Sequence, residues 1–219
     1  MDWRASSDAP GEGGPAGTRG EAAGRAGSAP GLYVPSTVTG AAKILVVGPL
    51  GVGKTTLIST VSEIRPLLTE AMMTRAGARV DTAVRPSKAT TTVSLDFGRL
   101  TLGGDLVLYL FGAPGQRRFL PVWRELARGA LGALALVDTR HLEASFDALG
   151  YLEDLDMPFS VAVNAFPDSV RHREEDLRAA LDLLPDTPLG VCDARDRPSS
   201  LRALAVLVRH LLSLARETR

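Results

Sequence analysis

The sequence has few of the residues that bind metals through sulfur or imidazole, or that join a chain covalently to itself. It contains one cysteine, Cys192, and three histidines, His141, His172 and His210. One cysteine cannot form an internal disulfide, and the three histidines lack the spacing of a metal site. Because no histidine stands in a motif that would activate it, Cys192 is expected to be a small buried residue and not a nucleophile.

The sequence also lacks an excess of charge of one sign and any long apolar run. Lys and Arg together number 25, as do Asp and Glu, so no overall charge favours nucleic acid or an anionic membrane. Apolar runs such as residues 130–137 are far shorter than the roughly 20 residues needed to span a bilayer. No apolar signal-peptide core follows Met1, and no lipidation motif is present. We therefore expect a cytoplasmic protein with no membrane anchor of its own and no nucleic-acid partner.

The first 39 residues differ in composition from the rest of the chain. They are rich in Gly, Ala, Pro and Ser and contain little apolar bulk. Such a segment cannot bury enough apolar surface to offset the entropy lost on ordering. The sequence therefore predicts a disordered tail over residues 1–39 and one folded domain over residues 40–219. A docking role for the tail, through Trp3 or residues 32–34, remains open.

A glycine-rich stretch at residues 48–55 follows a short buried strand and matches the pattern G-x-x-x-x-G-K-[ST]. Glycines let the backbone bend round an anion and direct several N–H groups toward it. Lys54 is expected to place an ammonium beside the β and γ phosphates, and Thr55 to offer a hydroxyl to Mg²⁺. The positive end of the next helix then faces the phosphates. The expected nucleotide-binding residues here are Gly48, Gly51, Val52, Gly53, Lys54, Thr55 and Thr56.

The rest of the folded part alternates between strand-like and helix-like segments. The strand at 43–47 and a helix at 54–65, ended by Pro66, precede a long irregular connection at 66–92. A hairpin follows, with strands at 93–102 and 106–111. Helices are expected at 119–126, 142–155, 173–184 and 198–219, the last capped near Asp196, and strands at 134–137, 159–163 and 188–191. This order predicts an α/β fold with a mostly parallel sheet and one antiparallel edge hairpin strand.

This order of motifs and elements, over about residues 41–219, resembles the Ras-like small GTPases, which are P-loop NTPases. Within them the chain is most similar to the bacterial MglA-like branch, and specifically to the GTPases of the actinobacterial conservons. The resemblance implies a small G domain that binds GTP or GDP with Mg²⁺ and hydrolyses GTP slowly. It also implies a roadblock/LC7-type partner and a sensor histidine kinase complex, through which the protein would meet the membrane.

Two segments resemble the switch regions of these GTPases. Residues 92–97 resemble switch I, and Thr92 is the residue expected to close over the γ-phosphate and Mg²⁺, with Thr90 and Thr91 as alternatives. Residues 110–116 resemble switch II. The resemblance implies that Gly115 donates its N–H to the γ-phosphate and that Gln116 orients the attacking water.

The magnesium side of the expected site departs from the family pattern. Gly112 stands where the family has an aspartate, so a carboxylate that supports the metal is missing, which weakens Mg²⁺ binding. Asp138, at the end of another apolar run, is an alternative metal carboxylate. It is disfavoured because the strand before Gly112, and not the one before Asp138, is expected beside the phosphate-loop strand.

The base-reading motif also departs from the family's Asn-Lys-x-Asp. Asn164 is in place, but Ala165 replaces the lysine, and Pro167 occupies the aspartate position, one residue before Asp168. A bulge would bring Asp168 under the base, so guanine is favoured over adenine or a relaxed specificity. Residues 192–195 stand where the family has Ser-Ala-Lys. The resemblance assigns the base site to Asn164, Asp168, Asp193 and Ala194.

Two functions remain open at this point. In the first, the protein is a GTP-dependent switch whose contact surface, residues 117–123, is exposed and both apolar and basic. In the second, it is a nucleotide-binding scaffold without useful turnover, for which the changes at Gly112, Ala165 and Pro167 are symptoms of lost catalysis. No arginine finger is assigned.

Overall fold

The computed structural model describes residues 36–65, 67–73, 91–115 and 119–217. Its strands are β1 Gly40–Val47, β2 Leu67–Met73, β3 Thr91–Leu102, β4 Leu106–Gly112, β5 Ala130–Val137, β6 Phe159–Asn164 and β7 Leu189–Cys192. Its α-helices are α1 Lys54–Val61, α2 Leu120–Ala127, α3 Phe146–Asp154, α4 Glu174–Ala180 and α5 Arg197–Glu217. Most of the predicted tail lies outside the described residues. Its last part is attached to the β3–β4 turn, where Thr37 Oγ1 donates to the Gly104 carbonyl and the Thr39 N–H to that of Asp105.

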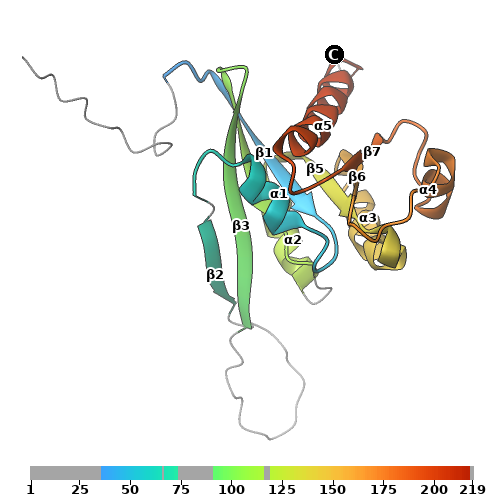
Figure 1. The fold of residues 1–219 in the computed structure, drawn as a ribbon. Coiled ribbons are helices and arrows are strands. Elements are labelled where there is room, and N and C mark those ends of the chain that lie inside the picture. The colour runs from blue at the N-terminus through green and yellow to red at the C-terminus, as the bar shows by residue number, and fades with distance from the viewer. Residues whose placement is uncertain (1–35, 66, 74–90, 116–118, 218–219) are drawn as a thin grey trace, which may run out of the picture.

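The strands form one seven-stranded sheet in the order β2-β3-β4-β1-β5-β6-β7 (Figure 1). Strands β4, β1, β5, β6 and β7 are parallel, which confirms the predicted α/β class. Strand β3 is antiparallel to both β4 and β2, so it is the strand that runs opposite to the rest of the described sheet, as predicted, but β2 and not β3 forms the edge. Strand β2 falls in the segment predicted to be irregular. It pairs with β3 from Leu67 opposite Phe97 to Met73 opposite Thr91, so a long-range partner stabilises it, not a local pattern.

Helices cover both faces of the sheet because successive strand residues point to opposite sides. Along β1, Ile44 and Val46 face a core shared with α1 and α5, while Leu45 and Val47 face a core shared with α2 and α3 (Figure 1). All four side chains are fully buried. The phosphate-loop strand is therefore held rigidly from both sides.

Helix α1 ends at Val61, earlier than the predicted boundary near Pro66. Ser62 has extended backbone angles, and its hydroxyl bonds both the N–H and the carbonyl of Ile64. A serine that satisfies local backbone groups in this way competes with continuation of the helix. At the start of α5 the predicted cap is confirmed, because the Asp196 carboxylate accepts the Ser199 N–H at 2.8 Å.

The predicted exposure of the contact surface over residues 117–123 is wrong for Phe119 and Trp123, while Arg117 and Arg118 lie outside the described residues. Phe119 and Trp123 are 8% and 3% exposed. The Trp123 indole N–H donates to the Pro114 carbonyl at 3.0 Å, and its ring meets the Tyr151 ring edge-on. Helical spacing cannot tell which face of a helix is buried, and here the large aromatic residues fill the core.

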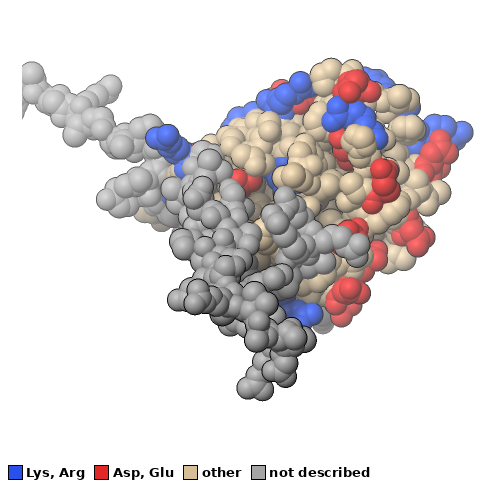
Figure 2. All heavy atoms as spheres, turned by 90° about the horizontal axis from the view of Figure 1, so that it is seen from below, with Lys and Arg blue, Asp and Glu red and all other residues tan. Residues whose placement is uncertain are grey.

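No helix among the described residues combines the length and the apolar character needed to cross a bilayer. Figure 2 shows basic and acidic side chains interspersed over the described part of one face. That face therefore presents no large field of one sign.

Candidate functional site

The loops that follow the five parallel strands all leave the sheet at its carboxyl edge. The strand order changes direction at β1, which has β4 on one side and β5 on the other. In open α/β sheets, ligands bind outside the carboxyl ends of the strands at this kind of position. The glycine-rich stretch after β1 lies there and runs directly into α1.

Lys54 is the first residue of α1, and its side chain folds back over the glycine-rich loop. Its Nζ donates to the carbonyls of Gly48 at 2.9 Å and Pro49 at 2.8 Å. Burial lowers the pKa of the Lys54 ammonium to about 8, and the Asp96 carboxylate partly opposes this shift. A cation is thus held at the mouth of the loop, beside the start of a helix. This arrangement is suited to a phosphate chain.

Gly53 must be a glycine because the Asn164 side chain lies directly against it. Asn164, at the end of β6, donates from Nδ2 to the Val52 carbonyl and accepts the Ala194 N–H at Oδ1, both at 2.9 Å. A Cβ on Gly53 would lie 2.6 Å from Asn164 Nδ2, and the φ of Gly53 is +107°. A side chain is excluded here on both grounds. The predicted base residues Asn164 and Ala194 are thereby joined to the phosphate loop.

Asp96 is a residue of the site for which the sequence analysis predicted no role. It lies on β3, is 8% exposed, and accepts the Thr55 hydroxyl at Oδ2 over 2.6 Å. Asp96 pairs with Gly112 of β4, and a Cβ on Gly112 would lie 3.0 Å from Asp96 Oδ2. The missing side chain at position 112 therefore leaves room for a carboxylate from the neighbouring strand. The sequence signal was its place in the segment that resembles switch I, within which no metal role was predicted for this residue.

The reason given for disfavouring Asp138 was wrong, because β5 as well as β4 is a neighbour of β1. The structure gives a different reason against Asp138 as the metal carboxylate. Its carboxylate is engaged by Arg140, whose Nε and Nη2 donate to it at 3.0 and 2.8 Å. Arg140 also lowers the pKa of Asp138. Asp96, and not Asp138, contacts the residue expected to bind magnesium.

Two of the three predicted switch residues lie in the described part of the structure. Gly115 lies against the phosphate loop, since a Cβ there would approach the Leu50 nitrogen to 2.5 Å and the Gly48 carbonyl oxygen to 2.8 Å. Gln116 lies outside the described residues. Thr92 lies within β3, paired with Met72 of β2, and so belongs to the sheet.

The remaining predicted binding residues are distributed around the loop. Gly51 has a positive φ of 82°, Val52 is 1% exposed, and Thr56 is exposed on α1. Asp193 is bonded to Arg195, which donates from its backbone N–H, Nε and Nη2 at 2.9 Å each. Asp168 is bonded to Arg140 Nη1 at 2.7 Å.

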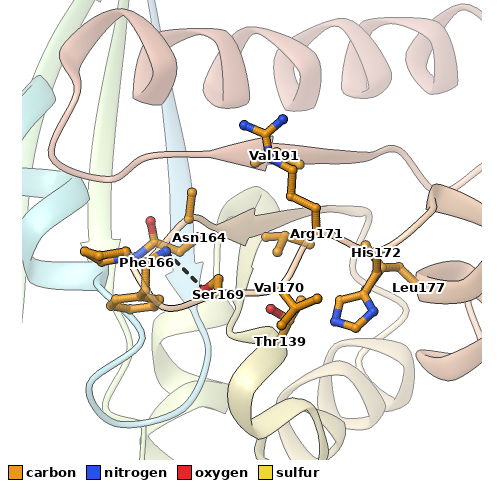
Figure 3. A pocket seen from close by; sticks show the side chains of 12 residues that line it. Thr139, Asn164, Phe166, Ser169, Val170, Arg171, His172, Leu177 and Val191 are labelled. Atoms are coloured by element: carbon orange, nitrogen blue, oxygen red, sulfur yellow. Dashed lines mark hydrogen bonds between the residues drawn. The ribbon is translucent and has the colours of Figure 1, made fainter.

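A cavity of about 550 Å³ lies beside the base segment (Figure 3). Its walls come from residues 163–167 and 169–172, the 3₁₀ segment Thr139–Ser145, α4 and β7. Asn164, Phe166 and Val191 border it, as labelled in Figure 3, while Asp168 and residues 193–195 are not among its lining residues. This volume lies in the range of small-molecule pockets.

His172 is among the residues that line this cavity. Within the described ranges there is no cluster of three or more His, Cys, Asp or Glu side chains able to hold a metal. Cys192 is fully buried, and burial raises the pKa of its thiol. It behaves as the small buried residue that was predicted.

Comparison with known proteins identifies a family to which this chain is similar. A family model described as "Conserved hypothetical ATP binding protein" matches residues 46–214. The match runs from β1 into α5 and covers the phosphate loop, Asp96, Asn164 and Asp168. No curated protein matches the chain.

Proposed function

The chain belongs to the family of conserved hypothetical ATP-binding proteins, and we propose that it is a nucleotide-dependent switch that binds GTP with Mg²⁺ and hydrolyses it slowly. Nucleotide binding by a P-loop fold follows from the family. The base, the metal and the switching are our proposals. The observation that carries them is one connected arrangement, in which the phosphate loop contacts Asp96 on one side and Asn164 on the other.

Thr55 and Asp96 would hold the magnesium ion. A hydroxyl and a carboxylate 2.6 Å apart are hard oxygen ligands, and Mg²⁺ is usually bound by one or two carboxylates together with substrate phosphates and water. Mg²⁺ supplies neutralisation of charge on the phosphate oxygens. Asp96 would thus supply the carboxylate that the Ras-like GTPases have at the position of Gly112. This favours the switch over the scaffold without turnover.

Other residues of the chain would bind the phosphates, orient the water and close over the site. Lys54 and the loop N–H groups bind the phosphates, and Gly115, already against the loop, donates to the γ-phosphate. Gln116 orients water, and Thr92 closes over the γ-phosphate and metal. Because Thr92 lies in β3, its approach to the γ-phosphate requires the start of that strand to move. The protein would then alternate between two arrangements, as a switch does.

Adenine nucleotide is the second candidate, and two observations favour it. The family description names ATP. Asp168, the expected guanine acceptor, follows Pro167, one residue later than the usual position. Guanine remains our first proposal because the chain resembles the MglA-like GTPases, and Asn164, which begins their base-reading motif, is held between the phosphate loop and residue 194.

The partners are proposed on the resemblance to MglA-like and conservon GTPases alone. We propose a roadblock/LC7-type protein and a sensor histidine kinase complex, with the protein in the cytoplasm and peripheral at the membrane through them. Co-purification with the roadblock-type protein in GTP but not in GDP is the expected result. Equal recovery in both nucleotides would contradict the switch.

The decisive experiment identifies the nucleotide that the protein retains. Purified protein is denatured, the released nucleotide is identified, and GTP and ATP turnover are timed. Lys54→Ala is expected to abolish retention, while Lys43→Ala, a lysine on β1 whose Nζ bonds the Arg128 carbonyl, is the matched control and should retain it. Retention by Lys54→Ala at wild-type occupancy would refute the site.

Turnover separates the switch from the scaffold. Gln116→Leu is expected to slow GTP hydrolysis without loss of binding, because water is no longer oriented. If the wild-type protein retains nucleotide but hydrolyses none, alone or with its partner, the scaffold is correct. Retained ADP or ATP in place of guanine nucleotide would establish the second candidate.

A further inference from the structure

Arg140 lies at the centre of a charged and aromatic cluster next to the base segment. Its guanidinium contacts Asp138, Asp168 and the ring of Phe166. No motif in the sequence singled it out. It comes just after β5, whereas Phe166 and Asp168 come from the loop after β6, so the cluster joins two neighbouring loops at the carboxyl edge of the sheet.

One side of this cluster is fixed to the sheet. The Asp138 side chain is only 9% exposed and immediately follows β5. It accepts the Arg140 backbone N–H at 3.0 Å as well as the guanidinium bonds from Nε and Nη2. A charge-assisted contact with several parallel bonds fixes both the position and the plane of a guanidinium. Arg140 is therefore held firmly at its Asp138 end.

The other side of Arg140 holds the loop. Its Nη1 donates to Asp168 Oδ1 at 2.7 Å, and its guanidinium carbon lies 3.8 Å from the centre of the Phe166 ring. Arginine can bond in its plane and stack on an aromatic face at the same time, which lysine cannot. The Asp168 side chain is 68% exposed, so packing does not hold it. The contact with Arg140 does.

This support matters because the base segment is one residue longer than the usual spacing. Pro167 precedes Asp168, and the loop closes on itself through the Ser169 N–H to the Phe166 carbonyl and the Phe166 N–H to the Ser169 hydroxyl. Such a turn sets where the chain goes but not where an exposed carboxylate points. The Arg140 contact also lowers the pKa of Asp168, which keeps it an ionised acceptor.

We propose that Arg140 is the positioning residue for base recognition: it holds the Asp168 carboxylate where it accepts the N–H groups of a guanine and so sets the preference for that base. The inference rests on the proposed function, in which the base binds at Asn164. Arg140 acts through Asp168 and does not itself touch the base.

The test compares GTP with inosine triphosphate, which lacks the 2-amino group that a carboxylate would accept. Affinities for both are measured for the wild type, Asp168→Ala, Arg140→Ala and the double variant. The wild type is expected to prefer GTP by about tenfold or more, the size of a hydrogen bond to a charged group. Each single variant should lose most of this preference, and the double variant should lose no more than Asp168→Ala.

Two further variants keep the test decisive. Arg128→Ala removes an exposed arginine paired with Glu125 and should leave the ratio of affinities unchanged. If Arg140→Ala does not fold because Asp138 is left unpaired, Arg140→Lys keeps a positive charge but loses the fork and the stacking. The same loss of preference is expected of it.

Three outcomes would overturn the proposal. One is an unchanged ratio in the Arg140 variants, and another is a stronger guanine preference, which would mean that Arg140 competes with the base. The third is a wild type that binds GTP and inosine triphosphate equally. In each of these a nucleotide still binds and the proposed function stands, whereas failure to bind any nucleotide would refute the proposed function itself.

Discussion

At the scale of single residues, the charge of Lys54 depends on pH near neutrality. Its pKa is lowered to about 8 by burial, so the free protein loses this charge above that pH. A phosphate chain beside it favours the charged form, and binding then takes up a proton. Nucleotide affinity is expected to be constant below pH 8 and to fall above it, approaching about tenfold per pH unit.

Measured dissociation constants on both sides of pH 8 check this prediction, with the free energy of unfolding followed in parallel. The unfolded chain, with Lys54 near its ordinary pKa of 10.5, binds more protons than the folded chain between these two values. The contribution of Lys54 to stability therefore rises with pH while affinity falls. An affinity that stays constant across pH 8 would show that Lys54 does not lose its charge there.

Asp96 gives a second residue-scale prediction. Asp96→Asn keeps the size of the side chain but removes the charge from the proposed metal ligand. We expect the Mg²⁺ dependence of nucleotide affinity to weaken, with a loss in metal affinity of about 10–100-fold or more. Titration of Mg²⁺ at fixed nucleotide, with a chelator as reference, measures it.

Asp138→Asn is the matched control for Asp96. Its carboxylate directly follows β5, a strand beside β1, but it is bound to Arg140. It should leave the Mg²⁺ dependence unchanged even where it alters base preference. A larger effect on Mg²⁺ from Asp138→Asn than from Asp96→Asn would assign the metal to the other carboxylate.

These residues also show which parts of a site a sequence can predict. The predicted roles of Lys54 and Thr55 rest on near neighbours in the chain, because spacing alone indicates the shape of the loop. Asp96 lies 41 positions from the Thr55 hydroxyl that it accepts, and only the pairing of β3 with β4 brings a carboxylate into the space left by Gly112. Contacts between distant strands leave no local pattern, so Asp96 and Arg140 were not foreseen.

At the scale of elements, α2 is attached to the turn that carries Gly115. The Trp123 indole N–H donates to the Pro114 carbonyl at 3.0 Å, and Gly115 lies directly against the phosphate loop. Trp123→Phe keeps a buried ring but leaves that carbonyl without its donor. We expect a loss of about 1–3 kcal/mol in the free energy of unfolding. We also expect weaker nucleotide binding, because the turn is less firmly held.

Urea unfolding and nucleotide titration of the same samples test this coupling. Tyr151→Phe is the control, since it removes a hydroxyl but keeps the ring that meets the edge of Trp123. It should change neither the turn nor the affinity. If Trp123→Phe lowers stability but leaves nucleotide affinity intact, α2 supports the fold and not the site.

Element boundaries show the same division between local and distant causes. Buried runs and helical spacing predicted most helices and strands, because burial repeats along each element. The end of α1 depends on the hydroxyl of Ser62. Strand β2 depends on pairing with the edge of β3 that faces away from β4. Both are consequences of particular partners, which composition and periodicity do not encode.

At the scale of the whole molecule, the site gathers contacts from both halves of the sheet. Asp96 approaches the phosphate loop from β3, on one side of β1, and Asn164 approaches it from β6, on the other. A nucleotide bound there would contact loops from most of the sheet at once. Binding should therefore stabilise the molecule as one cooperative unit and not only its loops.

The expected stabilisation can be stated from the binding equilibrium. A ligand that binds only the folded state at 100 times its dissociation constant adds about 2.7 kcal/mol to the free energy of unfolding. GTP with Mg²⁺ should raise the thermal midpoint of the wild type and of Lys43→Ala, but not that of Lys54→Ala. The same scan with ATP ranks the two bases, because the nucleotide with the higher affinity gives the larger shift at equal concentration. If neither nucleotide moves the midpoint of the wild type, the carboxyl edge of this sheet does not bind them.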